Sequence, residues 1–304
     1  MSLSRLRTFI EVYRQKSISA AARNLNLTQP AVSQHIAGLE SALGRRLFLR
    51  DNQGVTPTAA ADELVADVGD KLDAAEAALA SARARSVEVA GVLQVVGHGD
   101  FVAEVLAPEL LPLLEVGVRV RLQSGGHDTI QHMLIDGDCD LGFSAYATTD
   151  SRLRCEGLRS ERVLAVAAPA VCQKINRAKK PMQALLKTPL LAYNRELPLV
   201  EQWVARNKIA TPQIVPALIG QDLRTLRSLL CQGYGWTTLP AYLCTAAIER
   251  GELAEIAAPV ASTFLTYYLI WTPAGLRQPR VAHARQTILS RLRNSRQFPD
   301  ESRS

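Results

Sequence analysis

The sequence predicts an α/β protein in three parts: a mainly α-helical head, one long linker helix, and a larger domain of alternating strands and helices. Two short amphipathic helices with a tight turn between them, within Ser19 to Leu43, indicate the head. An apolar repeat with steps of four and three residues, from Ala61 to Ala82, indicates the linker helix. The strand–helix alternation starts at Gly91 and indicates the α/β domain.

The segment from Ser19 to Leu43 has the end signals of two helices. We expect Ser19 to cap the first helix, and Asn24, Asn26 and the polar break at Thr28-Gln29 to end it. Thr28 is then a good N-cap for the second helix, with Pro30 in its first turn, where a missing N–H costs little. The apolar positions of the second helix step by four, three and four: Val32, Ile36, Leu39 and Leu43. Together these signals predict a helix-turn-helix.

The opposite face of the second helix carries uncharged hydrogen-bonding groups at its N-terminal end, on Gln29, Ser33 and Gln34. A helix with such groups at its tip fits base edges in the major groove of DNA. On periodicity alone, an ordinary amphipathic helix pair from a bundle explains the segment equally well.

The flanking residues favour the DNA-binding interpretation. A helix over Leu3 to Tyr13 precedes the pair, and two short strands around an Asn52-Gln53-Gly54 turn follow it, like a wing. The pattern S-I-S-A-A-A-x-x-L-x-L-T-Q-P-A-V-S-Q-x-I-x-x-L-E-x-x-L-G-x-x-L-F-x-R resembles the winged helix-turn-helix of LysR-type transcriptional regulators over about the first 60 residues. The head would then comprise residues 1–58.

The resemblance implies roles for individual residues. Gln29, Pro30, Ser33 and Gln34 match the base-contacting positions of the family, and Arg50 in the wing is a plausible phosphate contact. The family often has an arginine where this chain has Gln34. That departure removes one charged contact in the groove and leaves the operator sequence open.

The charge distribution agrees with a nucleic-acid partner. Residues 1–58 hold eight Lys or Arg against three acidic residues, whereas residues 59–90 hold three against seven. A polyanion such as double-stranded DNA explains the basic surplus, because each cation near a phosphate releases counterions. A solvated basic face is the alternative that charge alone does not exclude.

Several other function classes find little support. No run of about 18 apolar residues predicts a membrane span, and residues 1–20 contain no apolar signal core, so we expect a cytoplasmic protein. The five cysteines are scattered and include no C-x-x-C pair, which favours reduced thiols over disulfides or zinc. His127 and His132 lack the i, i+4 spacing of a helical zinc site, and no catalytic or dinucleotide motif is found. We therefore expect no enzyme activity, no cofactor and no metal.

The linker helix is predicted over residues 59–88. Its apolar positions form a seam of about three heptads: Ala61, Val65, Val68, Leu72, Ala75, Leu79 and Ala82. Packing against a second copy would bury this stripe, and packing against the rest of the same chain is the alternative. In the resembled family this helix joins a homodimer, two dimers often form a homotetramer, and two heads read an interrupted palindrome.

Residues 89–304 are predicted to form two α/β lobes around a parallel sheet with helical crossovers. Lobe I would contain about 91–162 and 263–294, and lobe II about 163–262. This organisation resembles the periplasmic-binding-protein-like effector domain of the same family. The best local match is GYGWTTLP at Gly233 to Pro240. The tail from Asn294 to Ser304 is polar, and we expect it to be disordered.

In open α/β sheets a ligand binds beyond the carboxyl ends of the strands, near helix N-termini. This rule gives a set of candidate effector-binding residues: Asp100, Phe101, Ser124, Ser144, Tyr193, Asn194, Gln221 and Thr237. Structural roles compete with ligand contact; for example, Asp100 and Asp222 are good helix caps. A carboxylate in the cleft favours a ligand with an ammonium or guanidinium group, and hence an amino acid, especially a basic one.

Three functions remain on these observations. The first is a transcription factor in which a small molecule changes lobe closure and oligomer geometry on DNA. The second is a DNA-organising or constitutive repressor protein with no effector response. The third, a solute-binding or catalytic α/β protein with an accessory helical bundle, conflicts with the near-complete head pattern. The first is favoured.

Overall fold

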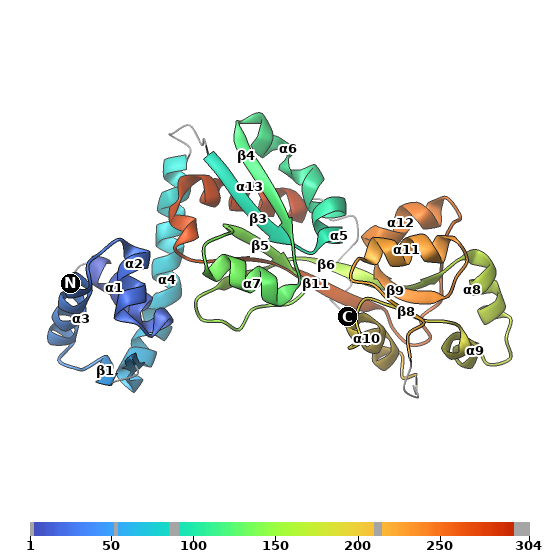
Figure 1. The fold of residues 1–304 in the computed structure, drawn as a ribbon, viewed down its shortest axis with the longest axis horizontal. Helices are drawn as coiled ribbons and strands as arrows, with labels where there is room; N and C mark the ends of the chain where they lie inside the picture. The colour runs from blue at the N-terminus through green and yellow to red at the C-terminus, as the bar shows by residue number, and fades with distance from the viewer. Residues whose placement is uncertain (1–2, 52–53, 85–90, 210–214, 295–304) are drawn as a thin grey trace.

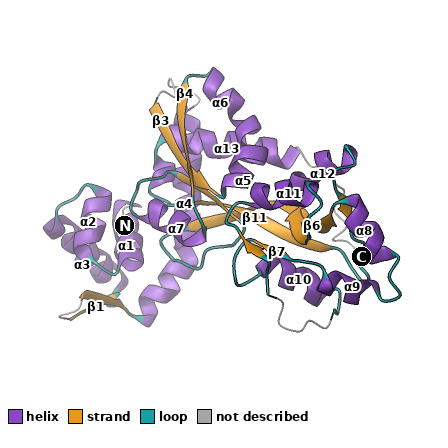
Figure 2. Cartoon of the chain, turned by 45° about the vertical axis from the view of Figure 1, so that its right-hand side comes forward, coloured by secondary structure: helices purple, strands orange, loops and turns teal. Residues whose placement is uncertain are grey.

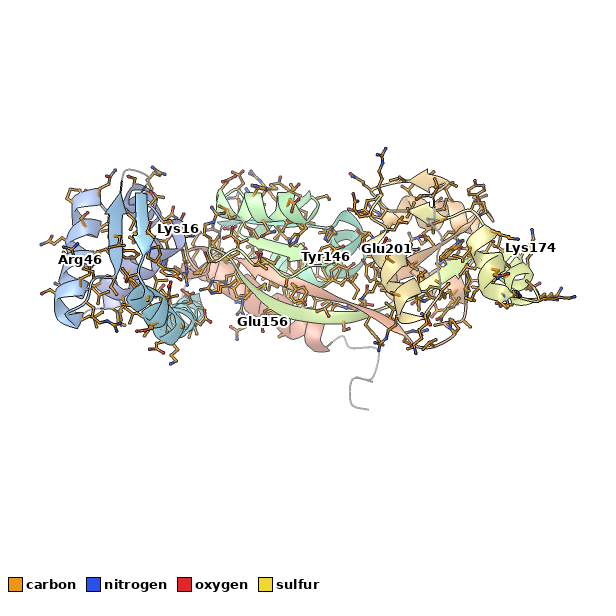
Figure 3. The ribbon with its side chains drawn as sticks, turned by 90° about the horizontal axis from the view of Figure 1, so that it is seen from below. Lys16, Arg46, Tyr146, Glu156, Lys174 and Glu201 are labelled. Atoms are coloured by element: carbon orange, nitrogen blue, oxygen red, sulfur yellow. The ribbon has the colours of Figure 1, made fainter. Side chains whose placement is uncertain are left out.

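The computed structural model describes residues 3–51, 54–84, 91–209 and 215–294. The head, lobe I and lobe II lie in a row, and the long helix α4 (Ala59–Ala84) runs between the head and lobe I (Figure 1). Seen from below, Arg46 lies in the head and Lys174 at the opposite end of the molecule, in lobe II (Figure 3). Helix α4 and lobe I therefore lie between the head and lobe II.

The head confirms the predicted helix-turn-helix and wing. Its elements are α1 (Leu3–Gln15), α2 (Ile18–Leu25), α3 (Gln29–Leu43), β1 (Phe48–Asp51) and β2 (Gly54–Pro57). The two strands pair antiparallel, with Arg50 opposite Val55. The predicted turn residues Asn52 and Gln53 lie outside the described residues. A single apolar core built around Phe9, Val32 and Leu39 joins the three helices to the wing.

The ends of the helices follow local chemistry, with two corrections. The N-cap of α2 is Ser17, not Ser19: Ser17 is extended, and its hydroxyl accepts a hydrogen bond from the Ala20 N–H. Thr28 caps α3 as predicted, through the Ala31 N–H. Leu43 is 37% exposed, so the buried stripe of α3 ends at Leu39.

Helix α4 packs against its own chain over part of its length. Val65, Val68 and Leu72 are partly buried against the core of the head. Ala77, further along, packs against the core of lobe I. Leu79 remains 54% exposed. The long helix is confirmed, and one side of it packs on its own chain along both halves, on the head first and then on lobe I. Its predicted end at residues 85–88 lies outside the described residues.

The α/β domain is built on a seven-stranded sheet with the order β10-β6-β11-β5-β3-β4, where β9 also pairs with β6. Its strands are β3 (Gly91–Gly97), β4 (Val118–Ser124), β5 (Leu141–Ser144), β6 (Arg154–Ala167), β9 (Trp236–Pro240), β10 (Ala254–Glu255) and β11 (Thr263–Trp271). The pairs β3–β4 and β3–β5 are parallel, but β11 and β6 form antiparallel pairs. The sheet is therefore mixed, not wholly parallel as the strand–helix alternation predicts.

Strands β6 and β11 run side by side from lobe I into lobe II and form the connection between the lobes (Figure 2). Sequence patterns predict β6 only from Val163 onward, because its first half, from Arg154, carries many polar residues. A small separate pair, β7 (Leu191–Ala192) with β8 (Leu218–Ile219), completes lobe II. The predicted start of β8, at Ile214, lies outside the described residues.

The helices of the domain cover the sheet on both sides. They are α5 (Gly99–Phe101), α6 (Leu111–Glu115), α7 (His127–Ile135), α8 (Pro169–Asn176), α9 (Pro181–Lys187), α10 (Pro198–Arg206), α11 (Leu223–Cys231), α12 (Ala241–Glu249) and α13 (Pro279–Asn294). The sequence does not predict α8, α9 or β10. Strand β11 pairs with β5, and α13 packs on β3 and on α4.

The predicted helix from Phe101 to Glu115 is helical throughout but not uniformly α. A π-helical turn (Val102–Leu106) and a 3-10 turn (Ala107–Leu110) lie between α5 and α6. Pro108 and Pro112 lack the N–H that an α-helix needs at interior positions, which accounts for the change in hydrogen-bond pattern.

All five cysteines are free in the structure. None of the described helices is both long and apolar enough to cross a membrane. The described residues include no group of three metal-binding side chains.

Candidate DNA-reading face and ligand cleft

The N-terminal end of α3 presents its polar side to the outside of the head. Gln29, Pro30 and Gln34 are exposed and Ser33 is half-buried, whereas Val32 on the other side is buried in the core. This arrangement leaves the predicted base-contacting side chains available to a groove. Arg50 lies in β1, but its side chain is outside what the structure describes.

Two interactions fix α3 relative to its neighbours. The carboxylate of Glu40 accepts hydrogen bonds from the Leu47 and Phe48 N–H groups at 2.7 and 3.2 Å, which ties the wing to the end of α3. The Thr8 hydroxyl of α1 contacts His35 Nδ1 at 2.8 Å. These contacts join α3 to the wing and to α1, and exposed Arg46 lies just before the wing.

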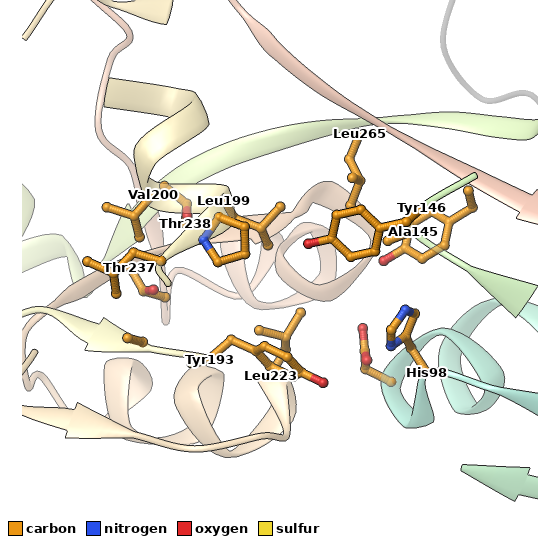
Figure 4. Close-up of a pocket in the computed structure, with 15 residues that line it drawn as sticks. His98, Ala145, Tyr146, Tyr193, Leu199, Val200, Leu223, Thr237, Thr238 and Leu265 are labelled. Carbon is orange, nitrogen blue, oxygen red and sulfur yellow. The ribbon is translucent and has the colours of Figure 1, made fainter. Parts of the chain in front are cut away.

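A cleft lies between the two lobes (Figure 4). Lobe I contributes residues from the turn after β3 and from the end of β5, including His98, Asp100 and Tyr146. Lobe II contributes residues from β7, β9 and the starts of α10 and α11, including Tyr193 and Thr238. The walls are largely apolar, as is usual for sites that bind small molecules.

Among the described residues, Asp100 carries the only carboxylate that lines this cleft, and it is 6% exposed. Its Oδ2 accepts a hydrogen bond from the Tyr242 hydroxyl at 2.6 Å, and Tyr242 lies 2.8 Å from the Tyr267 hydroxyl. Burial raises the pKa of Tyr242 well above its usual value, so this phenol stays protonated and donates. Asp100 is thus held by a neutral donor and does not cap α5, whose N-cap is His98.

The cations near Asp100 are paired with other acids. Arg224 forms an ion pair with Asp222 at 2.8 Å, and Arg227 with Glu104 at 3.3 Å. Within the described ranges, no lysine, arginine or histidine forms an ion pair with Asp100. Burying a carboxylate without a cation is costly, so the site favours a positively charged ligand group.

His98 is the second polar group on the lobe I side of the cleft. Burial lowers the pKa of its imidazole, against an opposing effect of Asp100. Its Nε2 is buried and has no hydrogen-bond partner among the described residues. A neutral His98 does not supply the cation that Asp100 lacks, and it leaves a nitrogen available to a ligand.

The comparisons with known proteins decide the family. Residues 3–62 match the model of the bacterial regulatory helix-turn-helix protein, lysR family, and residues 88–293 match the LysR substrate binding domain. The chain is 33% identical over 294 residues to the HTH-type transcriptional regulator AbaB of Streptomyces antibioticus, covering 95% of this chain and 97% of that protein. This chain belongs to the LysR family of transcriptional regulators.

Other similar proteins agree with this assignment. The HTH-type transcriptional regulator TrpI of Pseudomonas aeruginosa is 29% identical over 296 residues, covering 96% of this chain and 97% of its own. The structure of CrgA from Neisseria meningitidis matches with a TM-score of 0.61 at 23% identity, covering 96% and 99% of the two chains. Full-length LysG of Corynebacterium glutamicum, with arginine bound as effector, matches with a TM-score of 0.52 at 19% identity, covering 94% and 99%.

The LysR-type regulator therefore has a DNA-binding head and an effector-binding domain, and its similar proteins are regulators rather than enzymes. Of the residues predicted for its effector site, Asp100, Tyr193 and Thr237 line the cleft. Phe101 is fully buried behind them and stacks on Tyr267 with ring centroids 4.1 Å apart.

The other predicted effector residues of the regulator lie around the cleft rather than in its lining. Ser144 is fully buried and binds His127 Nδ1 at 2.8 Å. Ser124 and Gln221 are exposed, and Asn194 has a buried Oδ1 with no partner among the described residues. Contact of any of these residues with an effector stays a prediction.

Sequence patterns miss several lining residues of the regulator. Tyr146 follows Ser144 by two residues, so a wider application of the strand-end rule finds it. The group at the start of α10, Leu197 to Val200, has no such signal. Tyr267 lies inside β11, and the residue pattern of this strand predicts only an ordinary core residue at that position.

Proposed function

We propose that this regulator responds to a small molecule with an ammonium or guanidinium group, and that an amino acid, especially a basic one, is the effector. The observation that carries the proposal is the buried carboxylate of Asp100, which faces the cleft and has the Tyr242 hydroxyl as its donor. A cationic group in the cleft would balance the negative charge of the Asp100 carboxylate through a charge-assisted hydrogen bond. A ligand without such a group would leave the carboxylate uncompensated.

We further propose that ligand binding changes how the lobes close. The cleft is lined from both sides, and β6 and β11 connect the lobes. A ligand that contacts both lobes binds the closed arrangement better and shifts the population toward it. Lobe I carries α13, which packs on α4, so the change reaches the linker helix.

We propose that α4 pairs two copies of the chain. The apolar residues of α4 that the rest of the chain does not cover lie in the second half of the helix, where Ala75, Ala78 and Leu79 are exposed. Small side chains here would allow the helices to approach closely. Two heads joined in this way would read an interrupted palindrome, with Gln29, Pro30, Ser33 and Gln34 toward the bases, and two such dimers would form a tetramer.

Thermal unfolding of the purified chain against amino acids, amines and carboxylates tests the effector proposal. A ligand that binds the folded state raises the midpoint as its concentration exceeds its Kd. We expect a rise with cationic compounds that is lost in Asp100→Ala, together with a changed footprint on operator DNA. A rise with carboxylates alone would contradict the role of Asp100. Firm DNA binding without any ligand response would favour a DNA-organising or constitutive repressor protein.

A further inference from the structure

The lobe II wall of the cleft contains the start of a nine-residue helix, α10 (Pro198–Arg206). Pro198 has no N–H, and the Glu201 N–H donates to the Leu197 carbonyl at 2.8 Å. The N–H groups of Leu199 and Val200 lie in the first turn, where a helix supplies no carbonyl partner, and both residues line the cleft. These groups, with the positive end of the helix dipole, favour an anion.

A second, independent observation lies directly beside this helix start. Thr238, on β9, is 2% exposed, lines the same cleft, and its Oγ1 has no hydrogen-bond partner among the described residues. Figure 4 places it next to Leu199 and Val200, in agreement with the packing of α10 on β9. By contrast, the adjacent Thr237 hydroxyl donates to the Leu191 carbonyl at 2.5 Å. A buried hydroxyl without a partner costs stability, which a ligand acceptor would restore.

The two polar ends of the cleft belong to different lobes. Asp100 and His98 belong to lobe I, whereas Thr238 and the start of α10 belong to lobe II. Apolar side chains, among them Leu223 and Leu265, line the cleft as well (Figure 4). Glu201 is the nearest acid in the sequence of α10, but its side chain is exposed and does not line the cleft.

We infer that the effector is bipolar: a cationic nitrogen binds at Asp100, an apolar carbon chain follows, and a carboxylate binds at the start of α10 and the Thr238 hydroxyl. This is the chemistry of ω-amino carboxylic acids; lysine and arginine carry the same two ends and, in addition, an α-ammonium group beside the carboxylate. The contact of the cationic nitrogen with Asp100 rests on the proposed function, and the contact of the carboxylate with lobe II is new. Because each end binds a different lobe, such a molecule holds the lobes together, whereas a plain amine contacts one end.

The test compares molecules that carry one end or both ends, on the full chain by calorimetry and thermal shift. The probes are 4-aminobutanoate, 6-aminohexanoate, L-lysine and L-arginine, which carry both ends, cadaverine, which carries only cations, and hexanoate, which carries only the anion. We expect at least one bipolar probe to bind tenfold or more tightly than cadaverine or hexanoate. Equal binding of cadaverine and all bipolar probes would contradict a carboxylate-binding site at the start of α10.

Variants separate the two ends of the site. Thr238→Val keeps the shape and removes the hydroxyl, so it should weaken the bipolar probe about tenfold and leave cadaverine unchanged. Thr245→Val is the matched control, because Thr245 donates to the Ala241 carbonyl within α12 and does not line the cleft. A Thr238→Val protein that binds the bipolar probe as tightly as the control overturns the inference. Unchanged binding in Asp100→Asn would instead overturn the proposed function.

Discussion

The guanidinium group of Arg14 in the head donates to both carboxylate oxygens of Asp73 in α4, at 3.2 and 2.5 Å. Asp73 also lies 3.3 Å from the Arg154 guanidinium of lobe I. One turn further along α4, Glu76 pairs with Arg7 of the head and lies 3.4 Å from Arg277 of lobe I. Two acids of the linker helix thus connect the head to the effector domain of the same chain.

Removing the charge of Asp73 should destabilise the protein measurably. The Arg14 side chain is 5% exposed and would remain as a nearly buried cation without its partner. Breaking a fully buried pair costs ~3–5 kcal/mol, and since Asp73 retains some solvent contact we expect about 2–3 kcal/mol for Asp73→Asn. Urea unfolding followed by circular dichroism measures the difference.

Glu63→Gln is the matched control for this experiment. Glu63 lies on the same helix and pairs with Arg45 at 3.1 Å, but both side chains are more than half exposed. Exposed pairs contribute about 0–1 kcal/mol, so this variant should unfold nearly like the wild type. Equal losses in the two variants would mean that the Arg14–Asp73 pair does not connect the head and α4 in solution.

A second prediction concerns pH. Burial lowers the pKa of His98 below its ordinary value of 6.5 in the folded protein, so the unfolded chain binds the proton more readily. The stability that neutral His98 contributes is complete above about pH 6.5 and is lost as the pH falls toward the folded pKa. Midpoints measured from pH 7.5 to 5 should fall less steeply in His98→Asn than in the wild type. Parallel curves would show that His98 is not the group responsible.

A third prediction concerns the two glycines of the GYGWTTLP segment. Gly233 and Gly235 have φ values of +86° and +72°, which strain any other residue. A Cβ at Gly233 meets nothing within 4 Å, so Gly233→Ala should cost only about 1 kcal/mol of backbone strain. At Gly235 a Cβ would lie 2.5 Å from the Pro189 carbonyl oxygen. Gly235→Ala should therefore lower the unfolding midpoint much further, and equal midpoints would contradict this close approach.

The predictions from sequence succeed where the cause is local. Thr28 caps α3 and Asp222 caps α11 because each side chain bonds a backbone N–H two or three residues ahead. The head is similarly predictable, since its core is formed by the periodic apolar positions of consecutive helices. Ser17 is missed because Ser19, two residues later, offers the same hydroxyl, and the choice depends on where α1 ends.

The ligand cleft is only partly predictable because long-range contacts form it. The rule for strand ends identifies Asp100, but the donor to Asp100 is Tyr242, which is 142 residues away. Local sequence patterns likewise do not predict that β11 lies antiparallel between β5 and β6, because strand direction depends on the route of the chain between strands. Lobe II residues such as Thr238 join the cleft through this topology.

The last prediction concerns sequence reading by the head. Gln34 is exposed on the polar side of α3, where a bidentate amide contact to a base contributes about 1–3 kcal/mol of discrimination. Gln34→Ala should therefore relax preference at one base pair of each half-site, as measured by selection of bound sequences from a random DNA pool with the full chain. Arg46→Gln, at the edge of the wing, should instead weaken binding to all DNA sequences alike. It should also reduce the slope of log affinity against log salt concentration by about 1. If Gln34→Ala selected the same sequences with the same affinity, α3 would not present this face to the bases.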